Sequence, residues 1–362
     1  MFEKSLKLIQ NGVGSAFPCA AVAIGVGHTV FVRSFFGQRQ IKPYTHSITE
    51  GTLFDLASLS KLVATTMVAL KFIENGKLSL NDNIGSFIDN PGNYGDCKTL
   101  HLLTHTSGMP AGLPLFREAS GNEAALRSIL NSEKRFEPGK EVCYSCMGYI
   151  VLQHVLEKVG GQSLDRLADE YVFTPLGMSS ACYNPAAMRN STEKTPFAAT
   201  ELYSHNGEWA TGHVHDENAY FLGGVSGNAG VFATLDDMIA FAGMCSEKGI
   251  AKDGKRFLSK EIFDLALHNY TPRFSESRGL GFQLKGGQES PMGKQMPNGS
   301  YGHTGFTGTS FYTDCETGLW GVLLTNAVHY GRDNRSGYFA VRKSFYDMIV
   351  TEYKTLRNDI GI

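Results

Sequence analysis

The chain has 362 residues, of which 42% are apolar, and its formal net charge of −2 is ordinary for a globular protein. Basic and acidic residues are interspersed and no apolar run approaches the roughly 20 residues of a membrane span, so we predict neither nucleic-acid binding nor a transmembrane helix. Because the length exceeds what a single core usually supports, we expect two lobes.

The N-terminal segment and the cysteines bear on cellular location. Residues 1–10 predict an amphipathic helix and lack the long apolar stretch of a secretion signal. The 7 cysteines are scattered and odd in number, which favours reduced thiols over a disulfide framework. We therefore expect a cytoplasmic protein. Export of a precursor whose leader has been removed is the alternative.

A hairpin and a helix are predicted next along the chain. Residues 20–27 and 30–36 have the pattern of two paired strands. An extended segment then runs into a helix over residues 61–74, where apolar side chains recur at helical spacing. Residues three apart on a helix have Cβ atoms roughly 5–6 Å apart, so the Lys61 amine can reach the Ser58 hydroxyl.

This Ser-x-x-Lys pattern is the first candidate for chemistry. A serine hydroxyl is a weak nucleophile until a neighbouring base takes its proton, and Lys61 would place such a partner beside Ser58. The pattern alone is weak evidence, because a chain of this length contains it about once by chance. The alternative is a helix N-cap followed by a surface lysine.

The middle of the chain, from residue 80 to about 220, is predicted to be mostly helical with long loops. The clearest helices cover residues 101–104, 124–130, 148–159 and 163–172. A Pro-Gly turn precedes a loop that carries Tyr144. A phenol can act as a general base if nearby cations lower its pKa from about 10. The alternative is an aromatic anchor at the start of a helix.

Strands return after residue 223. We predict strands over residues 230–234, 279–284, 301–304, 308–313 and 319–326, and helices over 235–247 and 338–353. Because strands lie near both ends of the chain, we expect an α+β fold whose antiparallel sheet is built from both termini and flanked by helices. An α/β lobe of about 1–60 and 225–362 would enclose an inserted, mostly helical lobe of about 61–224.

The strand around His303 is unusually rich in glycine. It runs through Tyr301-Gly302-His303-Thr304-Gly305-Phe306. Such a strand lets a ligand or another backbone approach closely, and it could aim a backbone N–H at a developing oxyanion. The alternative is a tight turn between two core strands.

Three motifs together resemble those of class C serine β-lactamases and of the D-alanyl-D-alanine peptidases and esterases related to them. They are Ser58-x-x-Lys61, Tyr144-Ser145-x and His303-Thr304-Gly305, in the same order and at similar spacing. The stretches at 102–110 and 174–178 match as well. The stretches at 214–219 and 222–230 resemble the corresponding stretches of the branch that contains β-lactamase-like esterases, low-molecular-weight penicillin-binding proteins and N-acetylmuramoyl-L-alanine amidases. The resemblance spans nearly the whole chain and implies a single catalytic domain over 1–362 with a β-lactamase/transpeptidase-like fold.

The resemblance also implies roles for individual residues. Ser58 would attack a carbonyl, and Lys61 and Tyr144 would take and return the proton. His303 would polarise Tyr144 or meet a substrate carboxylate. The N–H groups of Ser58 and Phe306 would form an oxyanion hole. No cofactor or metal is needed for this chemistry.

The substrate side is less closely defined by the resemblance. Cys146, Thr304 and Gly305 would contact a substrate, which we expect to be a wall-derived muropeptide or a small ester, with β-lactams as further ligands. Cys146 stands where relatives usually have Asn, and a thiol donates and accepts hydrogen bonds only weakly. We therefore expect inefficient β-lactam hydrolysis. The alternative function is a penicillin-binding or sensor protein that is acylated and turns over poorly.

Other patterns point weakly to different chemistry. Cys143 and Cys146 have redox or metal-ligand spacing, but no second pair completes a zinc site. His213 and His215 lack the second Asp-His step of a zinc hydrolase, and the glycines of 223–230 lack a following Gly-Lys-Ser/Thr. His101 and His105 lie four apart, which suits a metal only if one helix contains both. We expect none of these to be a metal or phosphate site.

Overall fold

An antiparallel sheet joins the two ends of the chain. The computed structural model describes residues 1–185, 195–202, 207–286, 290–333 and 335–360; parts of the predicted helical lobe, 186–194 and 203–206, lie outside them. The sheet has the strand order β3-β2-β1-β10-β9-β8-β7. Its strands are β1 (Cys19–Val26), β2 (Thr29–Gln40), β3 (His46–Ser47), β7 (Gln283–Leu284), β8 (Tyr301–Thr304), β9 (Thr309–Thr313) and β10 (Leu319–Thr325). Because β1 pairs with β10, the predicted sheet built from both termini is confirmed.

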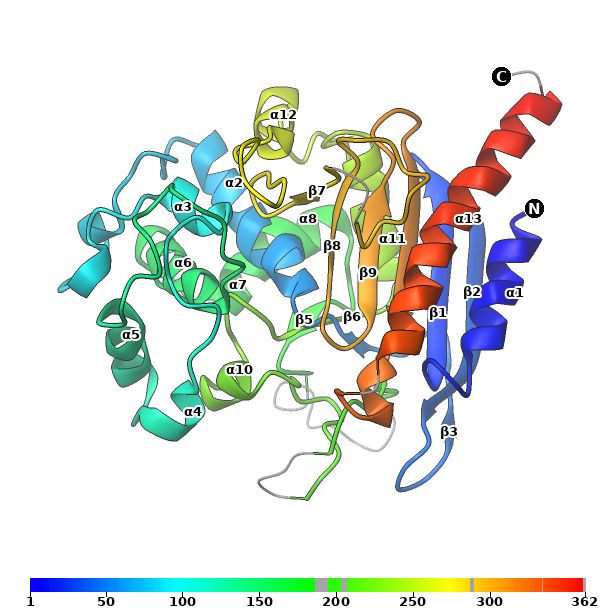
Figure 1. The fold of residues 1–362 in the computed structure, drawn as a ribbon, viewed down its shortest axis with the longest axis horizontal. Coiled ribbons are helices and arrows are strands. Elements are labelled where there is room, and N and C mark those ends of the chain that lie inside the picture. The colour runs from blue at the N-terminus through cyan, green and yellow to red at the C-terminus, as the bar shows by residue number, and fades with distance from the viewer. Residues whose placement is uncertain (186–194, 203–206, 287–289, 334, 361–362) are drawn as a thin grey trace.

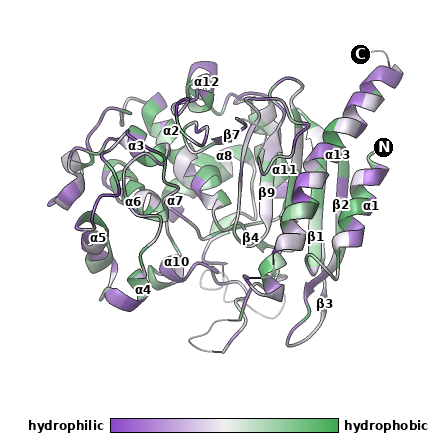
Figure 2. Ribbon diagram, viewed as in Figure 1, coloured by the Kyte–Doolittle hydropathy of each residue, from purple (hydrophilic) through white to green (hydrophobic). Residues whose placement is uncertain are grey.

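Helices cover both faces of this sheet (Figure 1). They are α1 (Glu3–Gly12) and α13 (Ser336–Ile360) on one face and α11 (Leu235–Ser246) on the other. Side chains alternate along β1 as the pleat requires, so Val22 joins a core with Ile9 and Tyr346, whereas Ala23 joins the core that contains Phe241. In Figure 2, α1 and α13 carry hydrophobic and hydrophilic residues side by side, as expected of helices with one buried face.

The helical part of the fold is inserted between β2 and the later strands. Its helices are η1 (Lys61–Thr66), α2 (Met67–Glu74), η2 (Ile84–Ser86), η3 (Gly92–Tyr94), α3 (Thr99–Leu103), α4 (Leu115–Glu118), α5 (Asn122–Leu130), α6 (Cys146–Gly160), α7 (Leu164–Ala168), η4 (Asp169–Phe173), α8 (Thr174–Leu176) and α10 (Glu217–Phe221). The helix α6 is buried along most of its length, and Ser145 caps its start by accepting from the Gly148 N–H. Two further helices, α12 (Lys260–Leu267) and η5 (Ala327–Tyr330), follow later in the chain. In the described residues, no helix combines the length and the apolar character needed to cross a bilayer.

A second, three-stranded sheet leads directly to the candidate nucleophile. It has the order β4-β6-β5, with β4 (Phe54–Asp55), β5 (Cys182–Tyr183) and β6 (Val231–Ala233). Since β4 ends shortly before Ser58, this sheet fixes where the start of η1 lies. The extended segment that was predicted before the helix is therefore confirmed.

The predicted helix over 61–74 and the predicted strand over 279–284 differ from the structure. The predicted helix 61–74 is a π-helix over Lys61–Thr66 before it becomes α-helical, and such segments occur frequently at functional sites. The predicted strand 279–284 is a strand only at its last two residues. The backbone N–H groups of Leu280 and Gly281 bond instead to the carbonyls of Ala266 and Leu103, so no ladder forms there.

Candidate active site

A strained turn presents Ser58. Ala57, the residue before it, has φ 48, a left-handed conformation that is unfavourable for a residue with a Cβ. The Asp55 carboxylate holds this turn by accepting hydrogen bonds from the backbone N–H of Ala57 at 2.8 Å and of His215 at 2.7 Å. Ser58 is therefore positioned by a buried carboxylate, and its side chain is half-buried at the start of η1.

Lys61 is fully buried and donates three hydrogen bonds. Its Nζ lies 3.0 Å from Ser58 Oγ, 2.9 Å from the Asn228 carbonyl oxygen and 3.4 Å from Cys146 Sγ. The alternative of a surface lysine is therefore wrong, since the exposed fraction of Lys61 is 0%. A buried ammonium must be paired, and these three acceptors satisfy it.

The charge state of Lys61 follows from its surroundings. Burial acts to lower the pKa of the Lys61 ammonium, but the acidic groups of Cys146 and Tyr144 outweigh burial, and the pKa is raised above its usual range. Lys61 therefore keeps its proton at neutral pH. In the resting site it acts as a hydrogen-bond donor to Ser58.

Two cations lie close to the Tyr144 ring. Lys61 Nζ is 5.1 Å from the centroid of the Tyr144 ring, and the guanidinium carbon of Arg278 is 5.4 Å from it. The ring of His303 is also close, with 5.9 Å between centroids. The structure thus brings together five residues, which we call the Ser58 cluster: Ser58, Lys61, Tyr144, Cys146 and His303.

His303 is a neutral imidazole in this environment. Burial, followed by the nearby cations Arg278 and Lys61, lowers the pKa of His303 to about 3. Its Nδ1 lies 2.7 Å from the Thr304 carbonyl oxygen, so Nδ1 carries the proton and donates to that oxygen. A neutral ring offers a substrate carboxylate no net charge.

The end of β8 provides the candidate oxyanion hole. A Cβ on Gly305 would lie 2.3 Å from the Leu56 carbonyl oxygen, so only glycine lets this segment approach the turn that carries Ser58. In the described part of the chain, the backbone N–H groups of Ser58 and Phe306 have no hydrogen-bond partner. Phe306 itself is 41% exposed.

Strand β7 covers only part of the outer edge of β8. It pairs with β8 only at Tyr301 and Gly302, whereas β9 pairs with β8 along its whole length. In the described residues His303 and Thr304 therefore lie beyond the pairing with β7, and Thr304 is half-buried. This edge is where the sequence predicts that a substrate would be held.

Comparison with known proteins identifies the family. Residues 7–344 match the family model described as Beta-lactamase. The chain belongs to the β-lactamase family. The predicted resemblance is thereby confirmed over nearly the whole chain.

Proteins similar to this chain have the names of hydrolases. An Escherichia coli (strain K12) protein provisionally named a D-alanyl-D-alanine carboxypeptidase is 29% identical over 360 residues, which cover 89% of this chain and 81% of the relative. The N-acetylmuramyl-L-alanine amidase of Bacillus subtilis (strain 168) is 26% identical over 361 residues, covering 89% and 80%.

Solved structures share the fold. EstCE1, a hydrolase with promiscuous acyltransferase activity, has a TM-score of 0.74 at 21% identity, covering 95% of this chain and 98% of its own. The octameric penicillin-binding protein homologue from Pyrococcus abyssi has a TM-score of 0.72 at 20% identity, covering 99% and 77%. The predicted β-lactamase/transpeptidase-like α+β fold is confirmed.

Sequence reasoning missed two residues of this β-lactamase-family site. Arg278, only 4% exposed, faces the Tyr144 ring and is paired with Glu276 through Nε at 3.0 Å. The His105 ring also contacts Tyr144, with 4.4 Å between the ring centroids and the planes tilted by 38°. No local pattern predicts a lone arginine, whereas the matching stretch 102–110 could have drawn attention to His105.

The histidines considered as metal ligands have other partners. His215 Nε2 lies 2.9 Å from Glu201 Oε2, and His101 Nδ1 accepts from the Lys98 N–H. The His213 ring packs edge-on against Tyr220. Within the residues that the structure describes, no group of three or more His, Cys, Asp or Glu side chains is arranged to hold a metal ion.

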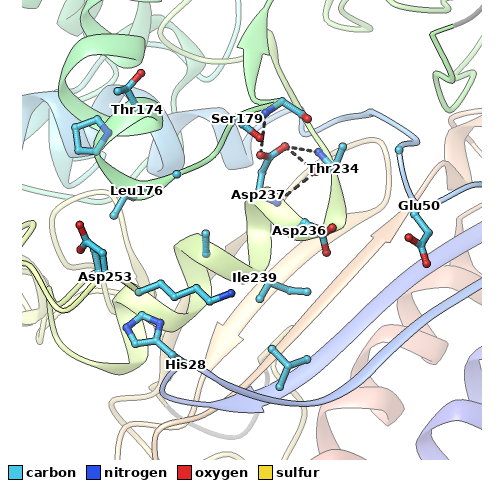
Figure 3. Close-up of a pocket in the computed structure, with 18 residues that line it drawn as sticks. His28, Glu50, Thr174, Leu176, Ser179, Thr234, Asp236, Asp237, Ile239 and Asp253 are labelled. Atoms are coloured by element: carbon cyan, nitrogen blue, oxygen red, sulfur yellow. Dashed lines mark hydrogen bonds between the residues drawn. The ribbon is translucent and has the colours of Figure 1, made fainter.

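A cavity of about 830 Å³ lies away from the Ser58 cluster, and Figure 3 shows its lining. Its acidic side chains already have structural partners. Glu50 and Asp236 both accept from Arg33, and Asp237 accepts from the backbone N–H and the hydroxyl of Thr234 at the start of α11. None of the residues of the Ser58 cluster lines this cavity, so we do not treat it as the active site.

Proposed function

We propose that the protein is a serine hydrolase that forms an acyl-enzyme on Ser58 while cleaving an ester, amide or peptide bond. The observation that carries the proposal is the 3.0 Å contact between Lys61 Nζ and Ser58 Oγ, with the Tyr144 ring over the same ammonium. Membership of the β-lactamase family and the hydrolase names of its relatives support the same function.

The geometry suggests how the proton moves. Ser58 Oγ attacks the substrate carbonyl carbon while its proton passes to Tyr144, because Lys61 is already protonated. A cation beside a phenol stabilises the phenolate that must be present to accept this proton, and Lys61 and Arg278 both lie beside the ring. Tyr144 then returns the proton to the leaving group. Water releases the acyl group by the reverse exchange.

The negative charge on the substrate oxygen also needs a partner. The backbone N–H groups of Ser58 and Phe306 would donate to it, and one such donor is worth about 10²–10³ in rate. His303, being neutral, would act on Tyr144 rather than as a positive charge for a carboxylate. Lys61 holds the Ser58 oxygen in place throughout.

For the substrate we propose a wall-derived muropeptide or a small ester. The relatives are named for peptide and amide bonds of the cell wall. Cys146 occupies the place beside Lys61 and offers a substrate amide only a weak hydrogen-bonding group. We therefore expect β-lactams to acylate the protein but to be turned over slowly.

A substrate screen tests the proposal. p-Nitrophenyl esters, nitrocefin, D-alanyl peptides and muropeptides are assayed for turnover, and the protein mass is measured after each. Turnover of any of these, lost in Ser58→Ala, supports the hydrolase. A persistent β-lactam adduct with no turnover of any substrate would favour the penicillin-binding or sensor protein, which the weak thiol of Cys146 also allows.

A further inference from the structure

His105 contacts the candidate base Tyr144 and the peptide groups on both sides of it. Its backbone carbonyl accepts from the Cys143 N–H at 2.9 Å, and its Nδ1 accepts from the Ser145 N–H at 3.1 Å. Its ring lies 4.4 Å from the Tyr144 ring, with 38° between the planes. His105 therefore bonds to the residue before Tyr144 and to the residue after it, and its ring contacts the Tyr144 ring.

The ionisation state of His105 suits this arrangement. Burial, with the cations Arg278 and Lys61 adding to it, holds the pKa of His105 well below its usual range. The ring is therefore neutral, and because Nδ1 accepts from Ser145, the proton sits on Nε2. The Ser145 hydrogen bond persists across the pH range in which such an enzyme works.

The residue keeps two unfavourable features. Its φ of 58 lies in the left-handed region, which is costly for a residue with a Cβ. Its Nε2 is buried and, among the described residues, has no hydrogen-bond partner. Each unpaired buried polar group in a native structure calls for an explanation, and local strain is concentrated at functional sites. Both features are explained if the position must supply this carbonyl and this ring.

We infer that His105 is the positioning residue that holds the Tyr144 phenol against the Ser58–Lys61 pair. The inference rests on the proposed function, since it assigns the reason why Tyr144 is placed to exchange a proton with Ser58. A misplacement of about 1 Å at such a group can cost on the order of 10²-fold in rate. His105 itself touches neither substrate nor the reacting atoms, so its effect is indirect.

The loop has further supports that should keep it folded without the imidazole. Ser145 Oγ donates to the Pro110 carbonyl at 2.7 Å, and the Cys146 N–H donates to the Ala111 carbonyl at 3.0 Å. These contacts leave the loop attached to the segment after α3. Removing the ring should therefore loosen Tyr144 without unfolding its surroundings.

Two substitutions separate the contributions of His105. Glycine and asparagine both tolerate the left-handed backbone, so both keep the carbonyl bond to Cys143. The Asn Oδ1 is as many bonds from Cβ as the His Nδ1 and can accept from Ser145 in its place. His105→Gly loses the acceptor and the ring, whereas His105→Asn loses the ring alone. Folding of both is checked by thermal melting.

The experiment measures kcat and KM for p-nitrophenyl butyrate, with active sites counted by a fluorophosphonate. We expect His105→Gly to lower kcat per active site by about tenfold or more, with KM changed by less than about threefold, because the proton transfer is affected rather than binding. His105→Asn should recover at least part of this loss.

Ser58→Ala in the same assay separates the two ideas. If Ser58→Ala is inactive but His105→Gly keeps the wild-type kcat per active site, the inference fails and the proposed function stands. The inference also fails, with the proposed function intact, if His105→Gly lowers only the melting temperature or the fraction of active sites. If Ser58→Ala keeps wild-type activity, the proposed function fails and the role of His105 fails with it.

Discussion

Lys61 donates a 2.9 Å hydrogen bond from Nζ to the backbone carbonyl of Asn228, which lies 167 positions further along the chain. This contact gives the ammonium a long-range partner in addition to its short-range partner Ser58. It ties the helix η1 to the loop before β6, so that the ammonium cannot swing away from the nucleophile. Because the acceptor is a backbone atom, the contact does not depend on which side chain stands at position 228.

Replacing Lys61 should abolish most of the activity, while the protein keeps its fold. Lys61→Met keeps a long, unbranched side chain in the buried space and removes the ammonium. We expect kcat/KM for p-nitrophenyl butyrate to fall by about 10²–10⁴-fold, the range for general acid–base catalysis, because Tyr144 loses a cation that stabilises its phenolate. Lys71→Met is the matched control, because Lys71 bonds to Glu74 and the Phe257 carbonyl and should leave the activity unchanged. Equal activity in the two variants would contradict the role of Lys61.

Cys146 should set the preference between β-lactams and simple esters. In Cys146→Asn the amide can bond a substrate acylamide, and a neutral hydrogen bond is worth about 0.5–1.5 kcal/mol. That corresponds to a rise of up to roughly tenfold in kcat/KM for nitrocefin. p-Nitrophenyl butyrate, which lacks that amide, should change less. Cys143→Asn serves as the control, and an equal change for both substrates in Cys146→Asn would refute the assignment.

The sequence predicted the parts of the site that depend on short spacing. Ser58 and Lys61 share one turn, and the strand Tyr301–Thr304 was placed with the bounds that the structure has. The π-helix η1, which precedes α2, and the turn at residues 279–282 were not predictable, since they depend on partners in distant segments. Arg278 contacts Tyr144 only through the tertiary fold, which no local pattern encodes. The matching stretch 102–110 contains His105 but does not show its contact with Tyr144.

The buried histidine His303 should make the protein sensitive to acid. Its folded pKa of about 3 lies below the unfolded value of 6.5, so between these pH values the unfolded chain binds a proton that the native state does not. The free energy of unfolding must therefore decrease as pH falls from 6.5 towards 3. From this group alone we expect a decrease of about 3 kcal/mol between pH 7 and pH 4.

Denaturant unfolding at both pH values tests this contribution. His303→Gln should lose less stability on acidification than the wild type, by an amount of that order. His46 is exposed, so His46→Gln should lose as much free energy of unfolding on acidification as the wild type does. If His303→Gln and the wild type lose the same free energy between the two pH values, the assigned state of His303 is wrong.

Chelators should leave the hydrolase active. The proposed steps use Ser58, Tyr144 and Lys61, and His215, which was considered as a metal ligand, is hydrogen-bonded to Glu201. We expect the same rate for p-nitrophenyl butyrate before and after treatment with EDTA. A loss of activity that zinc restores would contradict the serine mechanism.

The most direct test of the serine mechanism is the mass of the protein after reaction with a fluorophosphonate, followed by peptide mapping. We predict one adduct on Ser58 in the wild type and none in Ser58→Ala. Ser60→Ala should be labelled like the wild type, because the Ser60 hydroxyl is buried and accepts from the Val231 N–H at 3.0 Å. Full labelling of Ser58→Ala, or an adduct mapped to another residue in the wild type, would contradict the central claim.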